Sequence, residues 1–567
     1  MYFRVKQAGR YRYLQIAESY REGRRVRQRV LATLGNLEEI AAQGGLDALL
    51  ASGARFTEKV AVLDARKAGA LAPGRFVRIG PDEVFRRIWA ELGIGETLRE
   101  TVGARRFLFE VERAVYLTVV HRLFESGSDR SAVQWREPYR LPGCELIELH
   151  QIYRSMGWLG SPLADQAGRT ALGPRCVKDL IEERLFAGRR DLFSTLSVVF
   201  FDTTTLYFEG HGGATLGQRG KSKDSRPDLP QMVVAVVLDG EGMPLCCEMW
   251  PGNTTDVKTL LPVVERLRAR FRIGQVCIVA DRGMISRDIL SQLDGPDCVQ
   301  PYILGVRMRA VKAVRLQVLG RAGRYRQVRD GEDGLDPLDV KEVWHEGRRY
   351  IVCRNPAQAQ RDRLAREQIV AALREKLRGG EKAMVGNKGF RKYLRKASAK
   401  AFEIDERKVI GEARYDGRWV LTTNTSMTAA EVAVQYKRLW TIEDTFRTMK
   451  TILQTRPVFH RLDRTIRGHV FCSFLALMVR RRLEQRLEAA GMDFEWAQVI
   501  ASLREVQEAE ADFSGRPVVI RSEMAGCSAH LFRAVGAPIP PAVRFPQPGA
   551  AEHGSVVPQP DRRSVTH

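Results

Sequence analysis

Three acidic residues stand in sequence contexts that suit metal-dependent chemistry. Asp202 interrupts the apolar run LSVVFFDTTTLYF, Asp281 ends the apolar run QVCIVADRGM, and Glu443 lies in YKRLWTIEDTFRTMK. Unpaired carboxylates in apolar surroundings are costly, and carboxylates that converge repel one another and raise their pKa values. A divalent cation removes that conflict, and carboxylate oxygens without His or Cys favour Mg²⁺ or Mn²⁺. Two such ions about 4 Å apart activate a water or a 3′-hydroxyl and stabilise the leaving oxygen of a phosphodiester.

Each acid also has an ordinary interpretation. Glu443 and Arg447 are four residues apart, which is the spacing of an exposed ion pair on a helix. A lone aspartate at a strand end, such as Asp281, is often a turn former. The order of the three acids, in strand, strand and helix contexts of a basic chain, favours the metal site.

The third acid lies in a stretch, residues 428–450, that is predicted to form one amphipathic helix. Its apolar positions recur at helical spacing and are Val432, Leu439, Ile442, Phe446 and Met449. Tyr436, Glu443 and Lys450 are each seven residues apart, so they are expected on nearly one face. Trp440 and Arg447 flank Glu443 at i−3 and i+4.

The charge of the chain points to a polyanionic partner. Its 567 residues contain 91 Lys and Arg against 68 Asp and Glu, a formal charge of +23. Nucleic acid is the first expectation and a membrane surface the weaker one. No apolar run of about 18 residues occurs and the N-terminus lacks a signal-peptide core, so a cytoplasmic protein without a membrane span is expected. None of the nine cysteines forms a C-x-x-C pair, so reduced, buried thiols are expected and a zinc site is not.

The elements that must position the three acids divide the chain into six predicted regions. They are a basic N-terminal β region of two or three strands (1–60), a helical, DNA-binding region (70–195), an α/β catalytic core with a mixed sheet (196–310 and 420–480), a β-rich and helical insertion (311–419), a C-terminal helical extension (481–536) and a disordered tail (537–567). In the core, Asn253 and Asp256 are expected to cap the next helix rather than bind metal.

Four pieces of the core together resemble the DDE transposases of bacterial insertion sequences. They are FFDTTTLYF, PGNTTDVKTL, IVADRGM and YKRLWTIEDTFRTMK, the last of which resembles the Tyr–Arg–Glu–Lys signature of one large group of these enzymes. The resemblance spans essentially residues 1–480. It implies a ribonuclease-H-like core in which Asp202, Asp281 and Glu443 form the metal-binding triad, with two Mg²⁺ or Mn²⁺ ions.

The resemblance also implies residues that contact DNA. Tyr436 and Lys450 match the first and last positions of the signature, which contact the phosphates of the transposon end. The arginine position falls on Leu439, which leaves open whether Arg438 or Arg447 replaces that contact. A further residue, Arg282, stands beside Asp281, where a phosphate contact and a surface ion pair are both open.

The activity that the resemblance implies is in-line attack on DNA phosphodiesters. Water would free the 3′ ends at the terminal inverted repeats of the element, and those hydroxyls would then attack target DNA, with a homodimer bridging the two ends. Two alternatives remain at this point. One is a ribonuclease-H-like nuclease that cuts without joining, and the other is a DNA-binding protein with a relict core.

Overall fold

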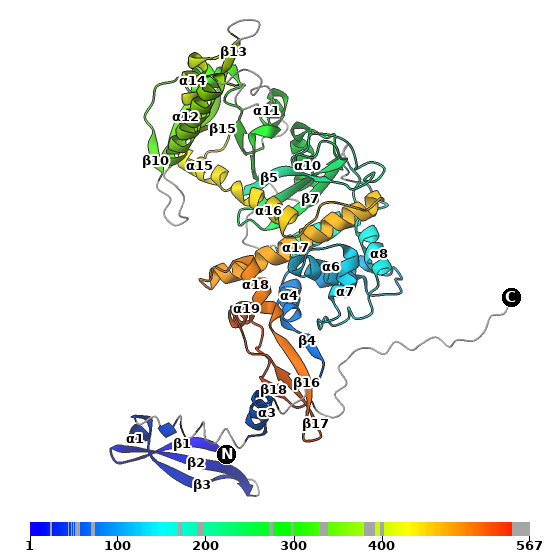
Figure 1. Ribbon diagram of the computed structural model, residues 1–567, viewed down its shortest axis with the longest axis vertical. Coiled ribbons are helices and arrows are strands. Elements are labelled where there is room, and N and C mark those ends of the chain that lie inside the picture. The colour runs from blue at the N-terminus through cyan, green and yellow to red at the C-terminus, as the bar shows by residue number, and fades with distance from the viewer. Residues whose placement is uncertain are drawn as a thin grey trace, which may run out of the picture.

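The chain forms an elongated molecule with the small N-terminal sheet at one end and helices α12 (Pro356–Arg378) and α14 (Glu406–Ala413) at the other (Figure 1). The computed structural model describes residues 1–22, 25–42, 45–46, 48, 50, 57–69, 74–167, 169, 173–189, 198–271, 276–295, 300–328, 338–378, 392–396 and 402–546. No helix among these residues combines the length and the apolar character that a bilayer-spanning segment needs.

The N-terminal sheet has the strands that the alternating sequence predicts. Strands β1 (Tyr2–Ala8), β2 (Tyr11–Glu22) and β3 (Arg25–Asn36) pair antiparallel in that order. Helices α1 (Leu37–Ala42) and α3 (Glu58–Lys67) follow them. The prediction of a small basic β region is therefore confirmed.

Five strands at the centre of the molecule have the ribonuclease-H-like arrangement. Strands β5 (Val198–Tyr207), β6 (Gln231–Asp239) and β7 (Pro244–Pro251) form an antiparallel meander. Strand β8 (Cys277–Ala280) then lies parallel to β5, and β9 (Tyr302–Val306) lies parallel to β8. This mixed sheet confirms the predicted fold class.

The region expected as an insertion extends this same sheet. Strands β10 (Arg326–Val328), β11 (Leu338–His345) and β12 (Arg348–Arg354) lead to β15 (Arg418–Thr423), which pairs with β9. The complete order is β10-β11-β12-β15-β9-β8-β5-β6-β7.

The remainder of the insertion lies between β12 and β15. It consists of helix α12 (Pro356–Arg378), the short strands β13 (Leu394–Lys396) and β14 (Phe402–Ile404), and helix α14 (Glu406–Ala413). A small apolar cluster around Leu373 and Tyr393 holds these elements together.

The apolar run around Asp202 forms a strand that is buried on both faces. In β5, Val198 and Phe200 belong to one apolar cluster, whereas Val199 and Phe201 belong to another. Successive side chains of a strand point to opposite faces, so a continuous apolar run is what a sheet covered on both sides requires.

Helices cover the two faces of the sheet. On one face lie α10 (Leu260–Phe271) and α11 (Arg287–Leu293). On the other lies the long helix α17 (Asp463–Ala489), which separates the sheet from the helical region (Figure 1). That region contains α4 (Gly80–Glu91), α5 (Ile94–Val102), α6 (Val111–Phe124), α7 (Asp129–Trp135), α8 (Leu149–Leu159) and α9 (Val177–Arg189). A single apolar core runs through α4, α6, α8 and α17 to the sheet.

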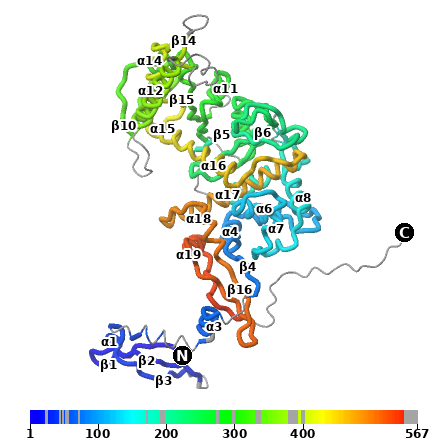
Figure 2. Tube along the Cα trace, viewed as in Figure 1, coloured from blue at the N-terminus to red at the C-terminus, as the bar shows by residue number. Residues whose placement is uncertain are grey.

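The C-terminal segment differs from the helical extension that the sequence predicts. Between helices α18 (Trp496–Arg504) and α19 (Ser528–Ala534) lie strands β16 (Gln507–Phe513) and β17 (Arg516–Arg521). Strand β16 pairs with β4 (Phe76–Arg78), so segments far apart in the sequence lie side by side (Figure 2). Pairing with β4 is a long-range contact that local sequence patterns do not encode.

Part of the predicted disordered tail is ordered. Strand β18 (Val543–Arg544) pairs with β17, and Val543 is buried. The prediction of disorder from residue 537 is therefore wrong for residues 543–544, because the Pro- and Gly-rich composition does not reveal a pairing partner. Residues 547–567 lie outside the described residues.

Candidate active site

The predicted helix over residues 428–450 is in fact two helices. Helix α15 (Ala429–Lys437) and helix α16 (Trp440–Thr451) meet at Arg438 and Leu439. The amide of Leu439 donates to the carbonyl of Tyr436 at 3.0 Å, and the amides of Thr441 and Ile442 also bond three residues back. This tighter turn, of the 3₁₀ type, changes the helical phase at the junction. Tyr436 consequently faces the sheet, whereas Glu443 is exposed.

Asp202 and Asp281 lie next to each other on parallel strands. The register of β5 and β8 pairs Phe201 with Ala280, and the two aspartates are the residues that follow. Both side chains are half-buried. The strand pairing thus brings together two of the three acids that the sequence singles out.

The environment of Asp202 disfavours its charged form. Burial raises the pKa of Asp202 to about 6, with smaller contributions in the same direction from the carboxylates of Asp281 and Asp256 and an opposing one from Lys223. The amide of Thr203 donates to Asp202 Oδ1 at 2.7 Å. A buried carboxylate with other carboxylates nearby fits a divalent cation, because the cation compensates the repulsion between them.

Tyr436 orients the second aspartate. Its hydroxyl donates to Asp281 Oδ1 at 3.0 Å, and burial together with the Asp281 charge raises the pKa of this phenol. The hydroxyl fits because residue 305 on β9 is glycine. A Cβ at Gly305 would lie 2.3 Å from the Tyr436 hydroxyl oxygen.

Asp256 is a site residue that the sequence interpretation missed. The hydroxyl of Thr203 donates to Asp256 Oδ1 at 2.7 Å, and Lys223 Nζ lies 3.5 Å from Asp256 Oδ2. The hydrogen bond of the Asp256 side chain therefore goes to Thr203 on β5. The sequence did indicate a role for Asp256, because the residue lies in PGNTTDVKTL, one of the four pieces that resemble DDE transposases.

Two of these carboxylates open onto a cleft with a basic wall. The cleft has a volume of about 480 Å³. Its lining residues are Lys221, Lys223, Asp256, Asp281, Arg282, Gly283, Arg307, Met308, Arg309 and Ala310. Cationic side chains beside carboxylates suit a phosphate that is held next to a bound cation.

Glu443 does not lie in one cluster with Asp202 and Asp281 in this structure. Its side chain is exposed and has no hydrogen bond or ion pair to any described residue. Within the described part of the chain, the ligand oxygens of Asp202, Asp281 and Glu443 do not all lie within 4.8 Å of one another. Helix α16 nevertheless packs against β5, the strand that carries Asp202. The expected ion pair between Glu443 and Arg447 does not form. Arg447 pairs with Asp444 instead, with 3.4 Å between Nη1 and Oδ1.

The remaining basic candidates have different surroundings. Lys450 Nζ donates to Asp224 Oδ1 at 2.8 Å, and burial lowers the pKa of Lys450. Leu439, at the arginine position of the signature, is buried in the main core. Arg438 lines a second cleft of about 710 Å³ between α16, α17 and the β6–β7 turn. Arg282 is exposed at the rim of the first cleft.

Comparison with known proteins identifies the family. A model described as the transposase DDE domain matches residues 194–479, just over half of the chain. The chain belongs to the DDE transposases. The N-terminal sheet and the helices after it match a second model, described as the IS1634 family transposase N-terminal domain, over residues 3–66.

The other comparisons add little to this identification. Among curated proteins nothing matches the transposase. Among solved structures it is similar to the cryo-EM structure of a piggyBac transposase synaptic complex with hairpin DNA, with 10% sequence identity and a TM-score of 0.39. That match covers 75% of this chain and 76% of the other.

Proposed function

We propose that this transposase binds the terminal inverted repeats of an insertion sequence, cleaves at the ends of the element and joins the 3′-hydroxyls to target DNA. The observation that carries the proposal is the pair of half-buried aspartates, Asp202 and Asp281, on neighbouring parallel strands beside a basic cleft. The reaction takes place on double-stranded DNA in the bacterial cytoplasm, and a homodimer holds the two ends.

The same site would hold two Mg²⁺ or Mn²⁺ ions. Asp202 and Asp281 supply two carboxylates, and Glu443 on α16 supplies the third. When bound, the cations supply Lewis-acid stabilisation of the charge on the attacking and leaving oxygens. The chain contributes the orientation of these groups: Tyr436 fixes one oxygen of Asp281, and the amide of Thr203 fixes one oxygen of Asp202.

The basic side chains around the cleft would hold the DNA backbone. Lys221 and Arg282 are well placed for phosphate contacts because they line the cleft beside Asp281. Tyr436 and Lys450 act mainly through the carboxylates that they contact, Asp281 and Asp224. Arg438 lies at the junction of α15 and α16, and Arg447 lies in α16. Both would contact DNA farther from the reacting phosphate. The N-terminal sheet, with exposed Tyr2, Tyr11 and Tyr20, and the helical region 70–195 would bind the repeat itself.

The test uses a plasmid that carries both ends of the element encoding this chain. With Mg²⁺, the wild-type protein should cut at the ends and produce joined products. Glu443→Gln should abolish cutting and leave end binding intact, whereas the matched control Asp444→Asn on the same helix should cut normally. Equal cutting by wild type and Glu443→Gln would contradict the assignment of the third acid.

A second pair of measurements separates the alternatives. Asp256→Asn should slow cutting without abolishing it, because Asp256 positions Thr203 and Lys223. Complete loss in Asp256→Asn with retention in Glu443→Gln would instead make Asp256 the third ligand. Cutting without any joining of pre-nicked ends would identify a nuclease, and end binding without Mg²⁺-dependent cutting would identify a relict core.

A further inference from the structure

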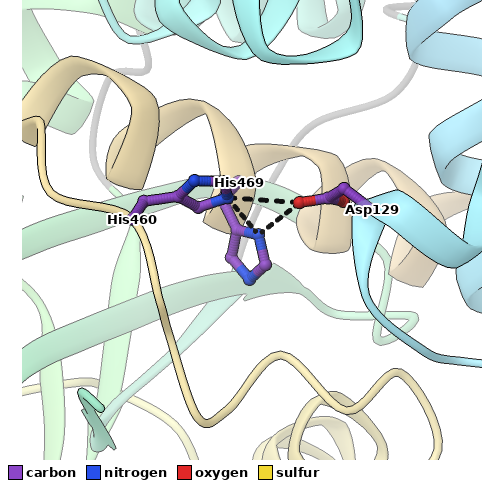
Figure 3. A group of neighbouring side chains, drawn as sticks. All are labelled: Asp129, His460 and His469. Atoms are coloured by element: carbon purple, nitrogen blue, oxygen red, sulfur yellow. Dashed lines mark hydrogen bonds and ion pairs between the residues drawn. The ribbon is translucent and has the colours of Figure 1, made fainter. Parts of the chain in front are cut away.

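A second cluster of ligand-type side chains lies on elements that do not carry Asp202, Asp281 or Glu443. It consists of Asp129 at the start of α7, His460 in the segment between α16 and α17, and His469 in α17 (Figure 3). Within the described residues, this is the one group of at least three His, Cys, Asp or Glu side chains whose ligand atoms all lie within 4.8 Å of one another.

The spacing of the three ligand atoms matches one face of a tetrahedral metal site. His460 Nε2 lies 3.2 Å from Asp129 Oδ2 and 3.2 Å from His469 Nδ1, and the third edge, from His469 Nδ1 to Asp129 Oδ2, is 3.5 Å. Zinc binds imidazole nitrogen and carboxylate oxygen at about 2.0–2.2 Å, so neighbouring ligands in a tetrahedral site lie about 3.3 Å apart. The three side chains therefore need little rearrangement to hold an ion.

The second nitrogen of His469 supports the same assignment. His469 Nε2 lies 3.2 Å from the backbone carbonyl of Thr455, to which it donates as an N–H group. A hydrogen bond of this kind fixes the tautomer and leaves the lone pair of Nδ1 directed at the cluster. The same arrangement, an imidazole backed by a carbonyl, is common behind metal-binding histidines.

The burial of the cluster suits a permanently bound ion. The side chains of Asp129, His460 and His469 are 6%, 13% and 11% exposed. Bulk water is largely excluded from the cluster, and His460 is the most exposed of the three side chains.

One neighbouring cation competes with a metal ion. Arg122 Nη2 lies 2.9 Å from Asp129 Oδ1 and 2.9 Å from His469 Nδ1. Arg122 and a metal ion would compete only for the lone pair of His469 Nδ1. At Asp129 they would use different oxygens, since Arg122 binds Oδ1 and the metal would bind Oδ2. When an ion binds, Arg122 would keep its bonds to Asp129 Oδ1 and Ser473 Oγ and release His469.

We propose that Asp129, His460 and His469 bind one Zn²⁺ ion, with water in the fourth position, as a structural clamp. Two imidazoles and one carboxylate select zinc and similar late first-row ions over Mg²⁺. The clamp ties α7 and α17 to the segment that leads out of α16, the helix that carries Glu443. This segment also contacts β5, since the amide of Val458 donates to the carbonyl of Tyr207. Zinc would therefore fix the connection between the helical region and the catalytic core.

The test uses chelator-stripped full-length protein and Co²⁺ as a spectroscopic probe, with excess Mg²⁺ present to occupy the carboxylate site. Wild type should bind one equivalent of Co²⁺ with the visible absorption of a four-coordinate ion, and Zn²⁺ should displace it and raise the melting temperature. His460→Ala should lose both effects. The matched control His150→Ala, at an exposed histidine of α8, should keep them.

A measurement on the wild type alone tests the ligand set even if the His460→Ala variant loses metal binding by misfolding. X-ray absorption at the zinc edge should give two imidazoles and oxygen ligands without sulfur. Absence of stoichiometric Co²⁺ binding in the wild type, unchanged binding in His460→Ala, or sulfur in the zinc shell would each overturn the proposal. None of these readouts depends on DNA cleavage, so they are independent of the function proposed above.

Discussion

The hydroxyl of Tyr436 donates a hydrogen bond to Oδ1 of Asp281 across 3.0 Å, and thereby links the first residue of the transposase signature to a carboxylate of the proposed metal site. This bond crosses from α15 to the end of β8. Under the proposed function, this bond would give the tyrosine a physical role, which is to hold one oxygen of Asp281, a residue that lines the cleft.

Tyr436→Phe should slow DNA cleavage without unfolding the protein. The ring still fills its half-buried site, but Asp281 loses a donor. Hydrogen bonds to charged groups contribute about 1.5–3 kcal/mol, so a reduction of about ten- to a hundredfold in the cleavage rate is expected. The measurement is single-turnover cutting with saturating Mg²⁺. Tyr350→Phe on β12 is the control and should cut at the wild-type rate.

Gly305→Ala should disturb the same bond from the other side. The new Cβ would lie 2.3 Å from the Tyr436 hydroxyl oxygen and 3.0 Å from the amide nitrogen of Arg282, so either β9 or the tyrosine must shift. A loss of about 1–3 kcal/mol in the free energy of unfolding is expected for such overpacking. Gly411→Ala on α14 is a suitable control, because a Cβ there meets no atom within 4 Å.

The two changes at this contact should not be additive. Removing the hydroxyl in the Gly305→Ala background relieves part of the clash. The double variant should therefore cleave better than the product of the two single effects predicts. Strict additivity would show that Gly305 and Tyr436 act on the site independently.

Asp202→Asn should stabilise the metal-free protein at neutral pH while abolishing cleavage. The pKa of Asp202 is about 6 in the folded state, against an ordinary value of 3.8. Between these values the unfolded chain has lost a proton that the folded chain retains, so stability falls as the pH rises through this window. The cost is complete above the folded pKa and amounts to about 3 kcal/mol.

The check is chemical denaturation in chelator. The Asp202→Asn variant should be more stable than wild type at about pH 7, and the gap should shrink as the pH falls and close below about pH 3, where both states of the wild type are largely protonated. Addition of Mg²⁺ should narrow the gap at neutral pH by stabilising only the wild type. Asp228→Asn, at an exposed aspartate beside Arg226, should show no such pattern.

Arg282→Gln should weaken DNA binding in a salt-dependent way. If Arg282 contacts one phosphate, the slope of log K against log salt concentration should become shallower by about one. Fluorescence anisotropy with an end fragment at several salt concentrations measures this slope. Arg363→Gln on α12, an exposed arginine paired with Glu367, should leave it unchanged. An unaltered slope for Arg282→Gln would place that side chain off the DNA path.

The sequence by itself determined the family and the fold class of the core, and it singled out two acids at the ends of buried apolar runs. The apolar run around Asp202 can only be satisfied in a strand covered on both faces, and Asp281 ends a second such run, so strand type and burial follow from composition and period. The seven-residue spacing singled out Tyr436, Glu443 and Lys450. The four pieces that resemble DDE transposases indicated the family.

Only the tertiary structure decided how those residues meet. The change of phase at Arg438 and Leu439 separates Tyr436 from Glu443, and Leu439 at this junction is buried in a core built from distant helices. Thr203 links Asp202 and Asp256, because its amide donates to the first and its hydroxyl to the second. The cluster of Asp129, His460 and His469 joins three separate elements. Such contacts form between positions far apart in the chain, where local periodicity carries no information about which side chains will face each other.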